Sequence, residues 1–447
     1  MITDMTKGNP SKVLISFTLP MLLSIVFQQM YNMADSIIAG KVLGVDALAA
    51  VGASYPITMI FMAVATGMNV GCSVVISQFF GAGRKEDTKT AIYTSMISSA
   101  VLSAILTVLG LVFIKPLISV LQTPKDIFSD CESYLAIYIA GLVFLFLYNI
   151  CTGIFTALGD SKTPLRFLIA SSVANIILDL VLVKRLGVPG VAWATFICQG
   201  VAAVCSVFVL ALRLKKIETQ KAYPKFSAFM LKKISMVSIP SILQQSFVSV
   251  GNLFIQGLVN SFSSAVIAGY AAAIKLNTFA VTTFTALGSS MSNFCAQNMG
   301  ARNIDRIKKG YRVAIVMLLV ISAIFSAVFL IFKSTLVEFF MDKSDVTLFE
   351  SALKTGIMFI TIVSPFYFVV ALKVATDGLL RGAGNMIAFM TSTFSDLILR
   401  VILSYIFVPF FKDTGIWLSW PIGWIISTAV SLGFYFSGKW KNINLTK

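Results

Sequence analysis

Long apolar stretches separated by short polar segments run through the whole chain of 447 residues. A helix needs about 20 residues to cross the hydrocarbon core of a bilayer, and each stretch is of about that length or longer. Charged residues and clusters of Gly and Pro mark the boundaries. The pattern predicts twelve transmembrane helices, near residues 13–40, 47–80, 89–114, 133–157, 164–183, 188–212, 234–262, 264–298, 313–332, 351–380, 385–410 and 415–438.

The composition agrees with this pattern. Hydrophobic residues make up 57% of the chain and charged residues 12%, whereas soluble domains have roughly 45–50% and about 25%. A soluble globular protein is therefore excluded, and we expect an all-α polytopic membrane protein. The first apolar run is too long for a signal-peptide core and lacks a small-residue cleavage pattern, so we interpret it as an uncleaved first span.

The chain is basic, with 35 Lys and Arg against 19 Asp and Glu. These cations lie in short loops between apolar runs and not on a soluble domain, so we predict no nucleic-acid partner. If the N-terminus is cytoplasmic, both tails and the loops on that side hold more than twice as many Lys and Arg as the opposite loops. The positive-inside rule then predicts a multi-pass protein of the cell (inner, cytoplasmic) membrane with both termini in the cytoplasm.

Histidine is absent, and the six cysteines are scattered without a C-x-x-C motif. The sequence therefore excludes histidine-based catalytic triads and offers no zinc-binding pattern. We predict that the protein is not an enzyme and needs no cofactor. Any group that takes up a proton inside the membrane must be a carboxyl group.

An internal repeat divides the chain into two halves. The segment PMLLSIVFQQMYN, from Pro20, recurs as PSILQQSFVSVGN, from Pro240; QFFGAGR recurs as QNMGAR, and NIILD aligns with DLILR. Because each half has six helices, both enter the membrane from the same side, as in the parallel repeats of transporters. We predict two pseudo-symmetric six-helix bundles: an N-terminal lobe (1–212), a cytoplasmic linker (213–233) and a C-terminal lobe (234–447).

Several motifs together resemble the multidrug and toxic compound extrusion (MATE) family. They are the first span with Pro20, Asn32 and Asp35, the GAGR loop, the LGDSKTP turn, the N-x-x-x-D pair of the fifth span and the LRGAGN turn. The resemblance covers nearly the whole chain. It implies a V-shaped cleft between the bundles and export of small, cationic, amphipathic molecules and other drugs in exchange for protons or sodium. We expect a monomer surrounded by membrane lipid.

Charged residues within the predicted spans need a partner or a role, because an ionised group at mid-bilayer costs at least about 2.5–3.5 kcal/mol. Residues four apart share a helix face, so Arg400 can neutralise Asp396, and Lys373 or Arg381 can neutralise Asp377. We interpret these charges as stabilising; alternatively, Asp396 and Arg400 line a cavity of the second lobe. We expect Lys275 to meet Asp377 or Asp396 from another helix, or to face the cleft.

The acids Asp35 and Asp179 differ because neither has Lys or Arg within four residues on its own helix. Both lie about 8–9 Å below the outer interface by helix rise. The repeat places Ile255 and Arg400 at the matching positions, so only the first lobe keeps an anionic pocket. Asn175 lies one turn before Asp179 on the same face. This asymmetry points to a cation site, although the two acids could instead pair with loop lysines.

Two carboxyl groups close together in a medium of low dielectric favour uptake of a proton by one of them. Alternatively, oxygen atoms of Asp35, Asp179, Asn175 and Thr195 could hold sodium as a metal site. The resemblance implies ion coupling at the positions of Asp35, Asp179 and Asn175. Together with Asn32, these residues form the predicted ion-coupling set, and the coupling ion is H+ or Na+.

The prolines at the start of the repeat have a mechanical interpretation. Pro20 and Pro240 each remove a backbone hydrogen bond, so each can act as a hinge that lets its helix bend, or as a fixed kink.

The alternative function is a flippase for a lipid-linked saccharide or another amphipathic lipid. An anionic headgroup would need a cluster of bases in the cleft, for which Lys275, Lys373 and Arg400 are the candidates. A uniporter or channel is a further possibility.

Overall fold

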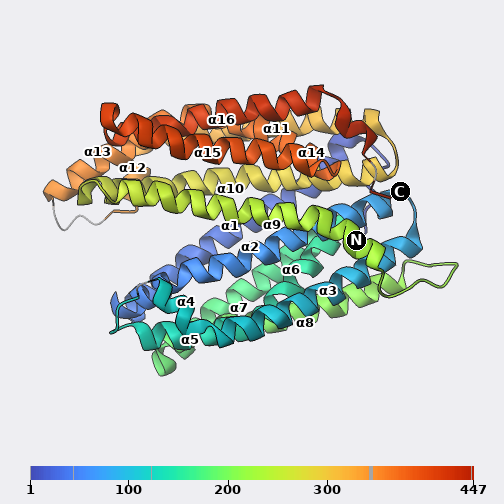
Figure 1. Ribbon diagram of the computed structural model, residues 1–447, viewed down its shortest axis with the longest axis horizontal. Helices are drawn as coiled ribbons and strands as arrows, with labels where there is room; N and C mark the ends of the chain where they lie inside the picture. Colours follow the sequence, from blue (N-terminus) through green and yellow to red (C-terminus); the bar gives the residue numbers. More distant parts are fainter. Residues whose placement is uncertain (1, 44, 122, 342–345, 444, 447) are drawn as a thin grey trace. The chain divides into compact units, whose positions relative to one another are not determined.

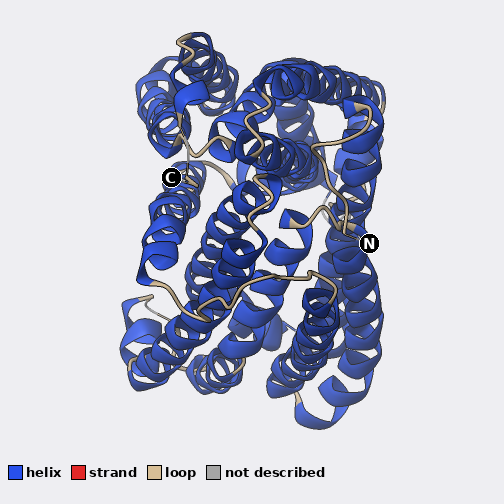
Figure 2. Ribbon diagram, turned by 90° about the vertical axis from the view of Figure 1, so that its right-hand side faces the viewer, coloured by secondary structure: helices blue, strands red, loops and turns tan. Residues whose placement is uncertain are grey.

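The computed structural model describes residues 2–43, 45–121, 123–341, 346–443 and 445–446, and the side chains of residues 32–49 lie outside this description. All regular structure within these ranges is helical (Figure 2). In the described residues, 11 helices are long and apolar enough to cross a membrane, and a bent helix pair brings the number to 12. The predicted all-α polytopic fold is confirmed.

The chain forms two compact units, the first of which contains residues up to Asp4, Leu19–Ile242 and Thr446. Its core is made by packing of α2 against α6, α6 against α8, and α7 against α8. The helices of this unit are α2 (Val45–Gly81), α3 (Lys85–Val112), α4 (Ile114–Val120), α5 (Phe128–Ala140), α6 (Leu142–Ala157), α7 (Lys162–Leu186) and α8 (Val188–Lys215).

The second unit contains Met5–Thr18 and Leu243–Leu445. In it α10 packs against α13 and α14, and α15 packs closely along α16, as the yellow to red part of Figure 1 shows. Its helices are α10 (Ser264–Gly300), α11 (Ile304–Ile331), α12 (Lys333–Glu338), α13 (Val346–Val363), the 3-10 helix η1 (Ser364–Phe366), α14 (Tyr367–Gly382), α15 (Met386–Phe411), α16 (Asp413–Phe436) and the 3-10 helix η2 (Lys439–Asn442).

Two helices contribute to both units. Helix α1 (Pro10–Leu43) passes from the second unit to the first at Leu19, and α9 (Ala228–Val259) passes from the first to the second at Leu243. Each contains a proline close to this point, Pro20 in α1 and Pro240 in α9. A proline in a helix lacks the N–H that would bind the carbonyl one turn earlier.

Two predicted spans are interrupted where the sequence analysis expects continuous helices. The span at 133–157 begins earlier and is a pair, α5 and α6, bent by 46°. The break falls at Gly141, where a Cβ atom would lie 3.1 Å from the ring of Phe196. The span at 351–380 contains η1, at a segment with Pro365, between α13 and α14. The short helices α4 and α12 were not expected either.

The same turn chemistry follows the matching helices α6 and α14. Gly159 and Gly384 have φ angles of 75° and 84°, which favour glycine because other residues meet steric strain there. The next residue then caps the following helix: Asp160 accepts a hydrogen bond from the N–H of Thr163 at 3.1 Å, and Asn385 accepts one from the first turn of α15 at 3.3 Å. The LGDSKTP and LRGAGN motifs are therefore helix-ending turns with built-in caps.

Helices α10 and α14 approach each other closely at two glycines. A Cβ atom on Gly378 would lie 2.3 Å from the carbonyl oxygen of Gly288. Small residues at such crossings let backbones pack directly, which is a main source of helix association in membranes.

We predict that Gly378→Ala destabilises the protein by about 1–3 kcal/mol, because the added methyl group forces the two backbones apart. Thermal unfolding of the detergent-purified protein measures the loss. Gly433→Ala is the matched control, since nothing lies within 4 Å of its Cβ position. Equal unfolding temperatures of the two variants would contradict the close crossing.

Candidate functional site

A polar cluster lies inside the first unit around Asp179, which is 1% exposed. Asn175, also buried, lies one turn earlier on α7. The hydrogen-bonding partners of Asn175 assign the nitrogen and oxygen of its side-chain amide. The nitrogen donates to Asp179 Oδ2 at 3.0 Å and to the hydroxyl of Tyr31 at 2.7 Å. The oxygen accepts the backbone N–H of Thr195 at 3.2 Å. Helices α1, α7 and α8 thus meet at the buried amide of Asn175, next to the carboxyl group of Asp179.

Three residues of the predicted ion-coupling set, Asp179, Asn175 and Thr195, are brought together in this cluster. Thr195 contributes its backbone N–H to Asn175. The side chains of Asp35 and Asn32 lie outside the described residues. Tyr31 was not predicted, and its position close to Asp35 in the sequence is the one signal that could have indicated it.

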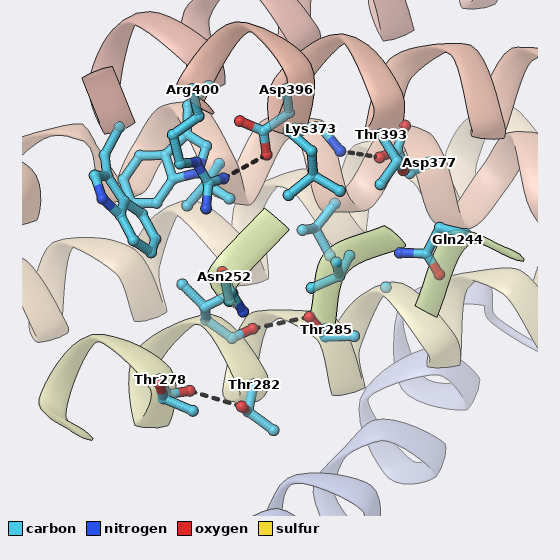
Figure 3. Close-up of a pocket in the computed structure, with 18 of the residues that line it drawn as sticks. Gln244, Asn252, Thr278, Thr282, Thr285, Lys373, Asp377, Thr393, Asp396 and Arg400 are labelled. Atoms are coloured by element: carbon cyan, nitrogen blue, oxygen red, sulfur yellow. Dashed lines mark hydrogen bonds and ion pairs between the residues drawn. The ribbon is translucent and has the colours of Figure 1, made fainter. Parts of the chain in front are cut away.

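A second polar region is a cavity of about 510 Å³ in the second unit, between α9, α10, α14, α15 and α16. Figure 3 shows its charged residues on one wall and threonines of α10 on the other. Amides, hydroxyls, aromatic rings and charged groups all line it: Gln244, Gln245, Asn252, Gln256 and Asn277; Thr278, Thr282, Thr285 and Thr393; Tyr270, Phe389, Trp420 and Trp424; Lys373, Asp377, Arg381, Asp396 and Arg400.

The first ion pair of this cavity lies along α14. Lys373 Nζ is 2.6 Å from Asp377 Oδ2, and both side chains are buried. Asp377 Oδ1 accepts hydrogen bonds from Ser392, at 3.0 Å, and from Ser431. Both oxygens of the carboxyl group therefore have partners within the second unit.

The second ion pair lies along α15. Arg400 Nη2 is 2.7 Å from Asp396 Oδ2, and the guanidinium group lies 4.0 Å from the ring centre of Trp420. The helical period brings these partners together, since residues four apart share a face. The alternative that Asp396 and Arg400 line a cavity of the second lobe agrees with their positions.

The other two bases differ from the expectations. The guanidinium of Arg381 does not share an ion pair with Asp377 but donates to Ser289 at 3.1 Å and to Ser292 at 3.3 Å. Lys275 is exposed and lies over the ring of Phe340, 5.4 Å from its centre. It lies outside the cavity lining, and the ion pairs of Asp377 and Asp396 are made by bases on their own helices.

Helices long and apolar enough to cross a membrane, in two units that hold a buried polar cluster and a polar cavity, are typical of a polytopic membrane transporter. The family model MatE matches residues 20–181 and 240–406, one segment in each half of the repeat. Since these segments make up most of the chain, this protein belongs to the MatE family.

Curated relatives and solved structures agree with this assignment. The probable multidrug resistance protein YpnP of Bacillus subtilis (strain 168) is 27% identical over 448 residues, which cover 99% of this chain and 98% of the relative. A FAD transporter of Shewanella oneidensis is 25% identical over 315 residues, or 69% of this chain and 70% of the relative. An outward-facing multidrug resistance MATE family transporter of the MOP superfamily superposes with a TM-score of 0.90 at 23% identity, covering 97% of each chain. The protein is a membrane transporter of this family and not an enzyme.

We predict that Lys373→Met lowers the free energy of unfolding by about 3 kcal/mol, because it leaves the buried Asp377 carboxylate without its counter-charge. The double variant Lys373→Met/Asp377→Asn should recover much of this loss, since neither charge remains. Chemical unfolding of both variants in detergent tests this. Additive losses from Lys373→Met and Asp377→Asn would show that the pair contributes no coupling energy.

Proposed function

We propose that this chain is a secondary antiporter that exports amphipathic organic cations in exchange for a coupling cation bound in the first half, by Asp35 and Asp179. The observation that carries the proposal is the partner of Asp179 on its own helix. That partner is the amide of Asn175, whereas Asp377 and Asp396 each bind a base one turn away. On its own helix Asp179 has this amide and no Lys or Arg within four residues, so binding of a cation changes the net charge of that helix face.

The coupling follows from this change of charge. When the coupling cation occupies Asp35 and Asp179, it neutralises the first half and weakens its attraction for a cationic substrate. The coupling cation and the substrate then each stabilise a different access state. Their exchange is coupled because each binds with a different free energy to the two access states. Exchange requires no covalent step.

Of the two coupling ions, the arrangement around Asn175 favours the proton. The amide oxygen that could bind sodium accepts the N–H of Thr195, and the amide nitrogen faces Asp179. Sodium needs several oxygen ligands. A proton needs only the carboxyl group.

Pro20 and Pro240 lie close to the two points where the chain passes between its compact units. This position supports their role as hinges in the exchange between access states. The excess of Lys and Arg on one side supports a multi-pass protein of the cell membrane with both termini in the cytoplasm.

The flippase alternative has weaker support. Lys275 is not part of the cavity lining, and Lys373 and Arg400 are each bound to an acid. The relative named as a FAD transporter indicates that membership of the family alone does not restrict substrates to cations.

We predict that Asp179→Asn lowers gradient-driven ethidium export by about 10-fold or more, because the coupling cation loses its buried carboxylate. Proteoliposomes with an imposed pH gradient, or an imposed sodium gradient, measure export and identify the ion.

Asp305→Asn is the control, since it removes one exposed acid, which pairs with Lys308 at 3.4 Å on the same helix. It should export like the unchanged protein. Full export by Asp179→Asn would refute the assignment of the coupling site.

A further inference from the structure

The cavity of the second unit has more basic than acidic side chains in its lining. Lys373, Arg381 and Arg400 stand against Asp377 and Asp396. Two of the bases are neutralised by ion pairs of 2.6 and 2.7 Å along their own helices. The lining therefore carries one excess positive charge.

Arg381 supplies that excess charge. Its guanidinium donates to the hydroxyls of Ser289 and Ser292 and lies over the ring of Phe389, 5.5 Å from its centre. All three partners are neutral. The nearby carboxylate of Asp377 has both of its oxygens occupied by Lys373 and two serines.

The opposite end of the lining offers hydrogen-bond donors. Arg400 Nε and Trp420 Nε1 are buried and have no acceptor among the described residues. Buried donors are rarely left unbound in native proteins, so this pair marks a place where an acceptor belongs. Asp396 Oδ1 also lacks a donor, but it faces α16, where a Cβ atom on Gly423 would lie 2.7 Å from it.

We propose that this cavity binds an aromatic organic anion, a flat ring system that carries a carboxylate or phosphate group. The guanidinium group of Arg381 would hold the anionic group, since its planar fork matches carboxylate and phosphate oxygens. At the other end of the lining, Arg400 Nε and Trp420 Nε1 would donate to an acceptor on the ring system. Trp420, Trp424 and Tyr270 provide flat faces for the ring, and the amides of α9 bind its polar edge. The volume of about 510 Å³ is in the range of sites for small ligands.

This site is separate from the carboxylates of the first half, and its occupant has the opposite charge to the substrate proposed above. The transporter would then carry, or be regulated by, organic anions as well as cations. All residues that line this anion site belong to the second unit.

Flavin mononucleotide and riboflavin are suitable probes, since they share one ring system and differ by a phosphate group. We expect the full-length protein in detergent to bind flavin mononucleotide about 10-fold or more tightly than riboflavin, because a charge-assisted hydrogen bond is lost without the phosphate. Quenching of flavin fluorescence measures both affinities.

The variant Arg381→Gln should abolish this preference, and Arg381→Lys should retain most of it. Raising the salt concentration should weaken binding of flavin mononucleotide to the unchanged protein and leave riboflavin unaffected, which tests the charge even if Arg381→Gln does not fold. Equal affinities for the two flavins, or a preference that survives Arg381→Gln, would overturn the proposal. Asp179→Asn should bind flavin mononucleotide normally, so failure of the antiport proposal and failure of this one are distinguishable.

Discussion

The cost of an ionised side chain in a medium of low dielectric constrains every part of this protein. Unpaired, such a group costs several kcal/mol within a bilayer. The chain meets this cost mainly with the helical period, which places Asp377 over Lys373 and Asp396 over Arg400 at 2.6 and 2.7 Å. A pair on one helix forms as soon as the helix does, so the charge is compensated before the helices pack.

The same constraint explains how the two halves of the repeat have diverged. Asn175 and Asp179 on α7 occupy the positions of Asp396 and Arg400 on α15, with the same spacing of four residues. In the first half the pair joins an amide to a carboxyl group, and in the second it joins a carboxylate to a guanidinium. One backbone geometry therefore presents a group that can take up a cation in one half and a compensated charge in the other.

Much of the fold could be predicted from the sequence because its signals are local. Hydropathy indicates the spans, and the spacing of four residues indicates both ion pairs. The bend at Gly141 was not predicted, and the neighbour that a side chain would meet there, Phe196, comes from α8, which no local sequence signal indicates. The interactions of Arg381 with Ser289 and of Arg400 with Trp420 also join different helices, and no sequence period indicates such contacts. For the same reason the sequence left open whether Lys275 meets an acid or faces the cleft, and it could not indicate the contact with Phe340.

Pairing along a helix also has a consequence for the cavity. Since Lys373 and Arg400 bind acids on their own helices, the charge that a ligand meets is set by the remaining base, Arg381, and its neutral serine partners. A neutral residue at that position would remove the excess positive charge of the lining without breaking either ion pair. In the first half, by contrast, a change at Asn175 alters the direct neighbour of the buried carboxyl group. In the function and the anion site proposed above, the duplicated helices separate two properties: a carboxyl group that binds the coupling cation, and a cavity with a fixed excess charge.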